Sequence, residues 1–188
     1  MDRGKVSEKD AKKSFFSEVI GWVMAIVFAV ILALFIKTFN FNTTIVQGSS
    51  MYPTLENGDK LISLKITLLI DNPDKGDIVI FDSPLNPQDD YIKRVIAVEG
   101  DEVRIADGLV YVNGKKLDEY YIENGISTQL DNSIDHWKIG KDMVFVLGDN
   151  RNYRASTDSR VFGEIPLDIV KGEAVFRYYP LNKIGVIR

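Results

Sequence analysis

The residues with the clearest chemical potential lie in a turn after an apolar run. The segment IVQGSSMYPTLENGD carries Ser49 and Ser50 in this turn, and Pro53 restrains the backbone that follows. A serine hydroxyl becomes a good nucleophile only when a neighbouring base removes its proton. Taken alone, the segment is equally well explained as an ordinary serine-rich turn before a proline. The chemistry therefore depends on whether the chain offers a base.

A lysine in a second apolar segment is a candidate base. In DDYIKRVIAVEGD, the alternation of a β-strand places Tyr91 and Lys93 on one face, with Ile92 and Arg94 on the other. If Lys93 points inward, burial lowers its pKa, and a neutral amine can accept the serine proton near neutral pH. A solvated lysine on a strand surface is the more common situation and is the competing interpretation.

Other kinds of hydrolytic site are disfavoured. The single histidine, His136, lies in a poorly patterned stretch, where an exposed or capping histidine is the ordinary explanation, so a Ser-His-Asp triad is not expected. The chain has no cysteine, which excludes a thiolate nucleophile and a cysteine-ligated metal. No cluster of histidine and carboxylate ligands suggests a zinc site. We therefore expect neither a metal nor an organic cofactor.

A third segment, LGDNRNYRASTDSRVFGEIP, collects carboxylates, arginines and hydroxyls after another apolar run. Its composition alone indicates a structural ion-pair network rather than an aspartic protease. The charged residues concerned are Asp149, Arg151, Asp158 and Arg160.

An apolar segment near the N-terminus is expected to position the rest of the chain. No charged residue occurs from Val19 to Ile36, and a helix of this length covers most of a hydrocarbon core roughly 30 Å thick. A cleaved signal sequence and a buried globular helix are the alternatives, but TFNFNTTIVQG lacks a persuasive cleavage site. We therefore expect a segment 1–17 followed by a transmembrane helix at residues 18–38.

Basic residues are concentrated before this helix, and only Lys37 is found in the first stretch after it. They are Arg3, Lys5, Lys9, Lys12 and Lys13. The positive-inside rule places the N-terminus in the cytoplasm and residues 39–188 on the outer face of a cell membrane.

The sequence of 39–188 is typical of one mainly antiparallel β domain. Short strand-like runs are separated by Gly, Asn, Asp and Pro, and Asn113-Gly114 favours a tight hairpin because both positions tolerate positive φ. From 118 to 141 the periodicity weakens, so we expect a variable insertion there. The predicted strands are TTIVQ, DKLISLKI, GDIVIF, DYIKRVIAV, DEVRI, GLVYV, DMVFVLG and GEAVFRYY.

The net charge of −4 does not indicate the basic surface that nucleic-acid-binding proteins need, and we expect no nucleic-acid partner.

In their order after the apolar segment, four blocks resemble the successive signatures of type I signal peptidases. They are SSMYPTL, GDIVIF, DYIKRVIAVEGD, and GDNR followed by STDSRVFGEIP. Each block is weak alone, but their joint order is specific. The resemblance, which is closest to Gram-positive enzymes, implies a membrane-bound serine endopeptidase that removes signal peptides from translocated preproteins through an acyl-enzyme.

The resemblance also implies roles for single residues. The family's serine directly precedes a methionine, which matches Ser50 before Met51 and not Ser49, and its lysine matches Lys93. Ser156 is then expected to hydrogen-bond and orient this lysine. The remaining supporting residues are the salt-bridged pair Asp158 and Arg160, together with Asp149, Asn150 and Arg151.

This sequence departs from the family pattern at two places. Some members have a serine two places before the nucleophile that adds a hydroxyl to the oxyanion hole; here the residue is Gly48, so backbone donors such as the N–H of Ser50 are expected to serve. The stretch NYRAST has six residues where many relatives have four. The longer loop affects the placement of Arg151 and Tyr153 more than that of Ser156.

The implied substrate is an extended preprotein with small residues at the first and third positions before the cut. The strand before Ser50 and the strand that leads to Lys93 are expected to flank it. The candidate pocket residues are Ile45, Val46, Tyr91 and Ile92. A self-cleaving repressor-type Ser-Lys protease is disfavoured by the membrane helix, whereas an inactive peptide-binding module anchored in lipid stays open until cleavage is measured.

Overall fold

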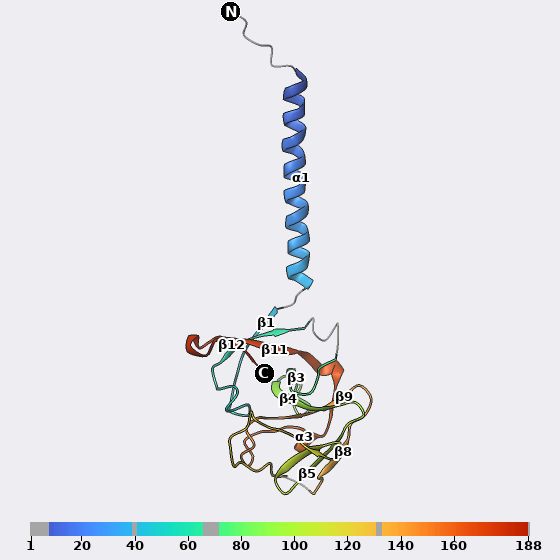
Figure 1. Ribbon diagram of the computed structural model, residues 1–188, viewed down its shortest axis with the longest axis vertical. Helices are drawn as coiled ribbons and strands as arrows, with labels where there is room; N and C mark the ends of the chain where they lie inside the picture. Colours follow the sequence, from blue (N-terminus) through green and yellow to red (C-terminus); the bar gives the residue numbers. More distant parts are fainter. Residues whose placement is uncertain (1–7, 39–40, 66–71, 131–132, 188) are drawn as a thin grey trace, which may run out of the picture. The chain divides into compact units, whose positions relative to one another are not determined.

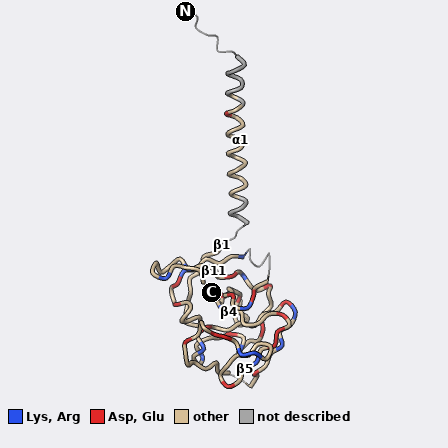
Figure 2. Tube along the Cα trace, viewed as in Figure 1, with Lys and Arg blue, Asp and Glu red and all other residues tan. Residues whose placement is uncertain are grey.

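The computed structural model describes residues 8–38, 41–65, 72–130 and 133–187 (Figure 1). The chain divides into two compact units, Met1–Asn40 and Phe41–Arg188. The second unit begins two residues after the expected start of the β domain at residue 39. In the view of Figure 2, acidic and basic residues are interspersed along its trace, in keeping with the modest net charge.

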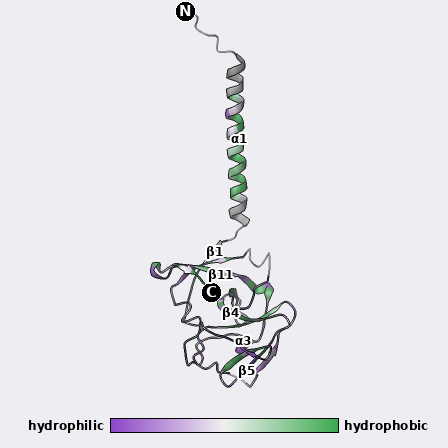
Figure 3. Ribbon diagram, in the orientation of Figure 1, coloured by the Kyte–Doolittle hydropathy of each residue, from purple (hydrophilic) through white to green (hydrophobic). Residues whose placement is uncertain are grey.

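The first unit contains helix α1 (Glu8–Thr38). It begins at Glu8, before the predicted membrane span at 18–38, because EKDAKKSFFSE contains good helix formers and neither Gly nor Pro. The middle of the helix is apolar and exposed, with Trp22 at 73% and Phe28 at 68% exposure (Figure 3). Within the described residues, no helix meets the length and hydropathy required of a membrane span. The single-pass anchor at 18–38 stays a prediction.

The second unit is mainly antiparallel β, as predicted, and is built on an eight-stranded sheet. Strand β12 (Gly185–Val186) pairs with β11 outside the main path. The other strands follow the order β1 (Phe41–Ile45), β2 (Lys60–Leu64), β11 (Val170–Tyr179), β3 (Ile78–Asp82), β4 (Asp90–Val98), β9 (Met143–Leu147) and β10 (Ile165–Pro166). Every pairing in this path is antiparallel.

A smaller four-stranded sheet follows the order β7 (Lys115–Lys116), β6 (Leu109–Val112), β5 (Glu102–Ala106) and β8 (His136–Lys138). The predicted Asn113-Gly114 hairpin joins β6 to β7, with φ of 51° and 72° at the two residues. The end of the expected insertion at 118–141 forms β8, which pairs with β5. The described residues of the unit also form three short helices: α3 (Ser159–Phe162), η1 (Leu167–Ile169) and η2 (Leu181–Lys183).

The centre of the large sheet is buried on both faces. Strand β3 and most of β4 bury consecutive residues and not alternate ones. Lys93 and Arg94 therefore lie on opposite faces, as strand alternation predicts, yet both are buried, at 3% and 1% exposure. The second face is covered because Leu117, Tyr121, Leu130 and Trp137 pack against a core cluster that includes residues of β4 and β9.

Candidate active site

Ser50 and Lys93 lie within hydrogen-bond distance of each other in the wall of a groove. Lys93 Nζ lies 2.9 Å from Ser50 Oγ and also donates to the carbonyl of Ile92 at 2.9 Å. The amine lies 5.1 Å from the centre of the Tyr91 ring, which agrees with the predicted shared face. A base within hydrogen-bond reach of a hydroxyl is the first geometric requirement for proton transfer between them.

The surroundings of Lys93 favour its neutral form. Burial disfavours the ammonium and lowers the pKa from its ordinary 10.5 to about 8, although the charges of Asp158 and Asp149 act in the opposite direction. Arg160 adds a smaller lowering effect. A lysine with this pKa is partly neutral near physiological pH, which an exposed lysine is not.

The turn that carries Ser50 is anchored in the core by buried apolar side chains. Met51 and Leu55 are at 1% and 0% exposure, and the N–H of Leu55 donates to the carbonyl of Met51. Gly48 has a φ of 85°, a conformation in which any side chain is strained, so a hydroxyl-bearing residue is disfavoured in this backbone. Among the described residues, no acceptor pairs with the N–H of Ser50, the donor expected for an oxyanion.

The loop 148–151, with sequence GDNR, fixes the same turn from the other side. The backbone N–H of Asn150 donates to the carbonyl of Ser50 at 3.0 Å, and its side-chain Nδ2 donates to the carbonyl of Ser49 at 2.9 Å. At Gly148 an added methyl group would overlap Ser156 Oγ and the carbonyl oxygen of Ser50. The close approach of loop and turn therefore requires a glycine.

Asp149 joins the serine turn to the lysine strand. It accepts a hydrogen bond from Thr54 Oγ1 and a bidentate pair from Arg94, with Nε and Nη2 at 2.8 and 2.7 Å. Both charged side chains are almost completely buried, at 1% for Arg94 and 0% for Asp149. Arg94 directly follows Lys93 in β4, so this ion pair links the backbones of both reacting residues.

Asp158 and Arg160 form the expected salt bridge. Arg160 donates from Nε and Nη2 to the two carboxylate oxygens at 2.8 Å each, and the N–H of Gly148 donates to Asp158 at 3.0 Å. Burial by itself would raise the pKa of Asp158, but the hydrogen bonds and charge of Arg160 hold it below its ordinary value. The carboxylate therefore stays ionised and braces the loop.

Ser156 differs from the expectation. It is buried near the site, where its side chain helps to lower the pKa of Asp158, but among the described residues the expected hydrogen bond to Lys93 is not formed. The reason is geometric: the hydroxyl lies beside Gly148, while the amine is held by Ser50 Oγ and the Ile92 carbonyl.

The longer loop after GDNR leaves Arg151 in the interior. Arg151 is at 1% exposure and donates to the carbonyl of Gly148 and to Thr128 Oγ1, both at 2.8 Å. Tyr153 is at 59% exposure, so the additional length enlarges only the outer part of the loop.

A groove of about 810 Å³ contains the dyad. All four predicted pocket residues line it, although Val46 is buried and Ile45 is exposed. β1 is the end strand of the sheet, and β9 pairs with β4 only from Arg94 onward. Each wall of the groove thus presents a strand edge that has no strand partner among the described residues, an arrangement that suits an added peptide strand.

Some residues at the site were given no role by the sequence. Arg94 and Thr54 meet Asp149, while Glu119 and Tyr121 reach the arginines from the expected insertion. An arginine inside an apolar strand is the one signal that could have indicated a buried ion pair. His136 lies in the small sheet beside Glu102 and does not line the groove. The part of the chain that the structure describes contains no cluster of potential metal ligands.

Comparisons with known proteins show the family of this chain. The family model "Signal peptidase, peptidase S26" matches residues 19–179. A probable signal peptidase I-2 of Synechocystis is 40% identical over 85% of this chain and 72% of its own length, and signal peptidase I S of Bacillus subtilis is 37% identical over 95% and 97%. A solved signal peptidase I from Enterococcus faecalis is 31% identical, covering 55% of this chain and 97% of that chain, with a TM-score of 0.46. The family match and the full-length relatives confirm the resemblance drawn from the four sequence blocks: this chain belongs to the signal peptidase family, peptidase S26.

Proposed function

We propose that this chain is a serine endopeptidase that removes signal peptides from preproteins, with Ser50 as nucleophile and Lys93 as general base. One observation carries the assignment: a buried lysine whose pKa falls to about 8 lies 2.9 Å from a serine hydroxyl at a groove. Membership of the family and the names of the relatives support the same reaction.

The proposed reaction has two stages. Neutral Lys93 accepts the Ser50 proton as Oγ attacks the scissile carbonyl, and the ammonium then protonates the leaving amine. Lys93 next activates a water molecule that hydrolyses the acyl-enzyme and releases Ser50. The N–H of Ser50 is the proposed oxyanion donor, and Asn150 supports it by fixing the carbonyls of Ser49 and Ser50.

The substrate is proposed to bind as an extended strand between β1 and the first residues of β4. The edges of these strands that have no strand partner in the described part of the chain supply backbone hydrogen bonds, and the side chains of the groove select small residues near the cut. Ile45, Val46, Tyr91 and Ile92 are the proposed contacts, since all four line the groove with the dyad.

The membrane anchor is also a proposal. The run without charges at Val19–Ile36 and the exposed apolar side chains in the middle of α1 support a single span. With basic residues concentrated before it, the span places the second unit on the outer face, where a translocated preprotein is still tethered. Membrane fractionation and protease protection of the full chain test this topology. If protease added outside intact cells cannot digest the second unit, the proposed orientation is contradicted.

Cleavage of a purified preprotein by the full chain in detergent tests the function. Ser50→Ala and Lys93→Met should each abolish processing, whereas the adjacent Ser49→Ala should retain it. Normal cleavage by either dyad variant would refute the assignment. A folded wild-type protein that binds the preprotein without cutting it would favour the alternative of a peptide-binding module.

A further inference from the structure

Residues 119–129, within the expected insertion, contact all three buried arginines around the dyad. The Tyr121 ring centre lies 4.1 Å from the guanidinium carbon of Arg94. Glu119 pairs with Arg151, which also donates to Thr128 Oγ1 at 2.8 Å. The carbonyl of Gln129 accepts a hydrogen bond from Arg160 at 3.0 Å. A stretch that looked variable in the sequence therefore completes the charged network.

Two of these arginines, Arg94 and Arg151, are connected to the reacting groups through short chains of bonds and contacts. Arg94 is adjacent to Lys93 in β4 and is paired with Asp149, while the next residue, Asn150, holds the carbonyl of Ser50. Arg151 Nε donates to the carbonyl of Gly148 at the other end of the same short loop. A displacement of either guanidinium would shift this loop and, with it, the serine turn.

A buried guanidinium needs a partner because its charge is costly to remove from water. Among the described residues, Glu119 is the only carboxylate that forms an ion pair with Arg151, and both side chains are buried, at 8% and 0% exposure. Arg94 has its carboxylate in Asp149, but one side of its guanidinium rests on the Tyr121 ring, an interaction that is stronger when water is excluded.

We propose that Glu119 and Tyr121 are positioning residues for the Ser50–Lys93 dyad, acting through Arg151 and Arg94 on the loop 148–151. This inference rests on the proposed function. On this proposal the insertion contributes to catalysis without contacting the substrate. Its residues set the distance between Ser50 and Lys93 and the electrostatic field at these two side chains.

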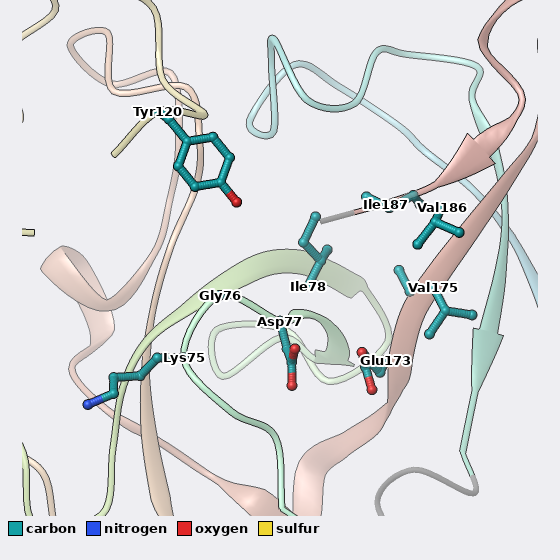
Figure 4. Close-up of a pocket in the computed structure, with 10 residues that line it drawn as sticks. Lys75, Gly76, Asp77, Ile78, Tyr120, Glu173, Val175, Val186 and Ile187 are labelled. Atoms are coloured by element: carbon teal, nitrogen blue, oxygen red, sulfur yellow. The ribbon is translucent and has the colours of Figure 1, made fainter. Parts of the chain in front are cut away.

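The next residue in the chain, Tyr120, offers a matched control. Its ring is at 76% exposure and lines a separate pocket of about 360 Å³, across from Val175 and Val186 (Figure 4). Neither Ser50 nor Lys93 lines this pocket. Tyr120→Leu makes the same chemical change as Tyr121→Leu. It removes the edge-to-face contact between the two tyrosine rings, whose centres lie 5.4 Å apart, but leaves the Tyr121 ring on Arg94.

Steady-state cleavage by the full chain, normalised to active sites titrated with a serine-directed fluorophosphonate, tests the proposal. Tyr121→Leu should lower kcat by about 10- to 100-fold with KM within about twofold, since small misplacements at a reacting centre have effects of this size. Tyr121→Phe keeps the ring and should restore most of kcat. Glu119→Gln should also lower kcat, and Tyr120→Leu should stay near wild type.

The pH midpoint of activity separates positioning from general destabilisation, because it does not depend on the fraction of folded enzyme. In the wild-type protein the charges that act most strongly on Lys93 are those of Asp158, Asp149 and Arg160, while the charge of Arg151 is compensated by Glu119. Tyr121→Leu loosens Arg94 from Asp149 and should raise the midpoint. Glu119→Gln leaves the charge of Arg151 uncompensated and should lower it. Each shift should be about 0.3 pH unit or more.

Two sets of results are decisive. If wild type cleaves and Ser50→Ala does not, but Glu119→Gln and Tyr121→Leu match wild type in kcat and in midpoint, the positioning role is wrong and the proposed function stands. If Ser50→Ala cleaves normally, the proposed function itself fails. Should Tyr121→Leu not fold, Glu119→Gln decides alone, because it preserves the size of the side chain and one hydrogen-bond acceptor.

Discussion

Cleavage should depend on pH through the deprotonation of Lys93. Burial lowers its pKa from 10.5 to about 8, so about one molecule in ten carries the neutral amine at pH 7. With the ordinary pKa the neutral fraction would be about one in 3,000, so burial raises the concentration of the active form about 300-fold at this pH. We expect kcat/KM to rise about tenfold per pH unit below about pH 7.5 and to level off above about pH 8.5.

A fluorogenic peptide that spans a signal-peptide cleavage site, measured below KM from about pH 6 to about pH 10, gives this profile directly, because kcat/KM reports the free enzyme. The far-ultraviolet circular dichroism spectrum at each pH excludes unfolding as the cause of any change. A rate that is flat between about pH 6 and about pH 8, or a midpoint near that of an exposed lysine, would refute the claim that a buried, neutral Lys93 is the base.

Three substitutions test other parts of the account. Gly148→Ala should lower kcat about 100-fold by pushing the nucleophile's carbonyl away, whereas Gly185→Ala, where a methyl meets open space, should have no effect on peptide cleavage. Asp149→Asn should lower the free energy of unfolding in urea by about 3–5 kcal/mol by unpairing a buried arginine, and the exposed Asp142→Asn should change it little. Lys93→Met should raise the free energy of unfolding at pH 7 by up to about 3 kcal/mol. The reason is that Lys93 binds a proton more weakly in the folded chain than in the unfolded chain, with pKa values of about 8 and 10.5. This stabilisation by Lys93→Met should shrink as the pH rises from about 8 to about 10.5.

Local sequence patterns predicted much of the second unit. Asp90–Val98 forms a strand with the predicted bounds, because its apolar and β-branched residues favour a pleated, buried position. Asn113-Gly114 forms the predicted hairpin because the turn needs two residues that tolerate positive φ. Helix α1 begins before the predicted membrane span, because that span was predicted from hydropathy, whereas Glu8 and the lysines after it favour a helix without being apolar.

Of the residues at the site, the sequence predicted those that lie in short motifs. The turn and the alternating strand made Ser50 and Lys93 candidates, and the resemblance of the four sequence blocks to the family assigned them; their contact spans 43 residues of sequence. The pairing of Arg94 with Asp149 spans 55 residues, and no local pattern specifies such a partner. The orientation of Ser156 depends on how closely Gly148 approaches the serine turn, a property of packing that residue types alone do not determine.

The most direct test of the central claim is the site and rate of covalent labelling. The full chain, treated with a fluorophosphonate and analysed by peptide mass spectrometry, should carry one adduct on Ser50 and none on Ser49. Labelling should follow the same pH midpoint as cleavage, near the Lys93 pKa of about 8, and should slow by about 100-fold or more in Lys93→Met. An adduct on another residue, or a Lys93→Met protein that is labelled at the wild-type rate, would contradict the Ser50–Lys93 dyad.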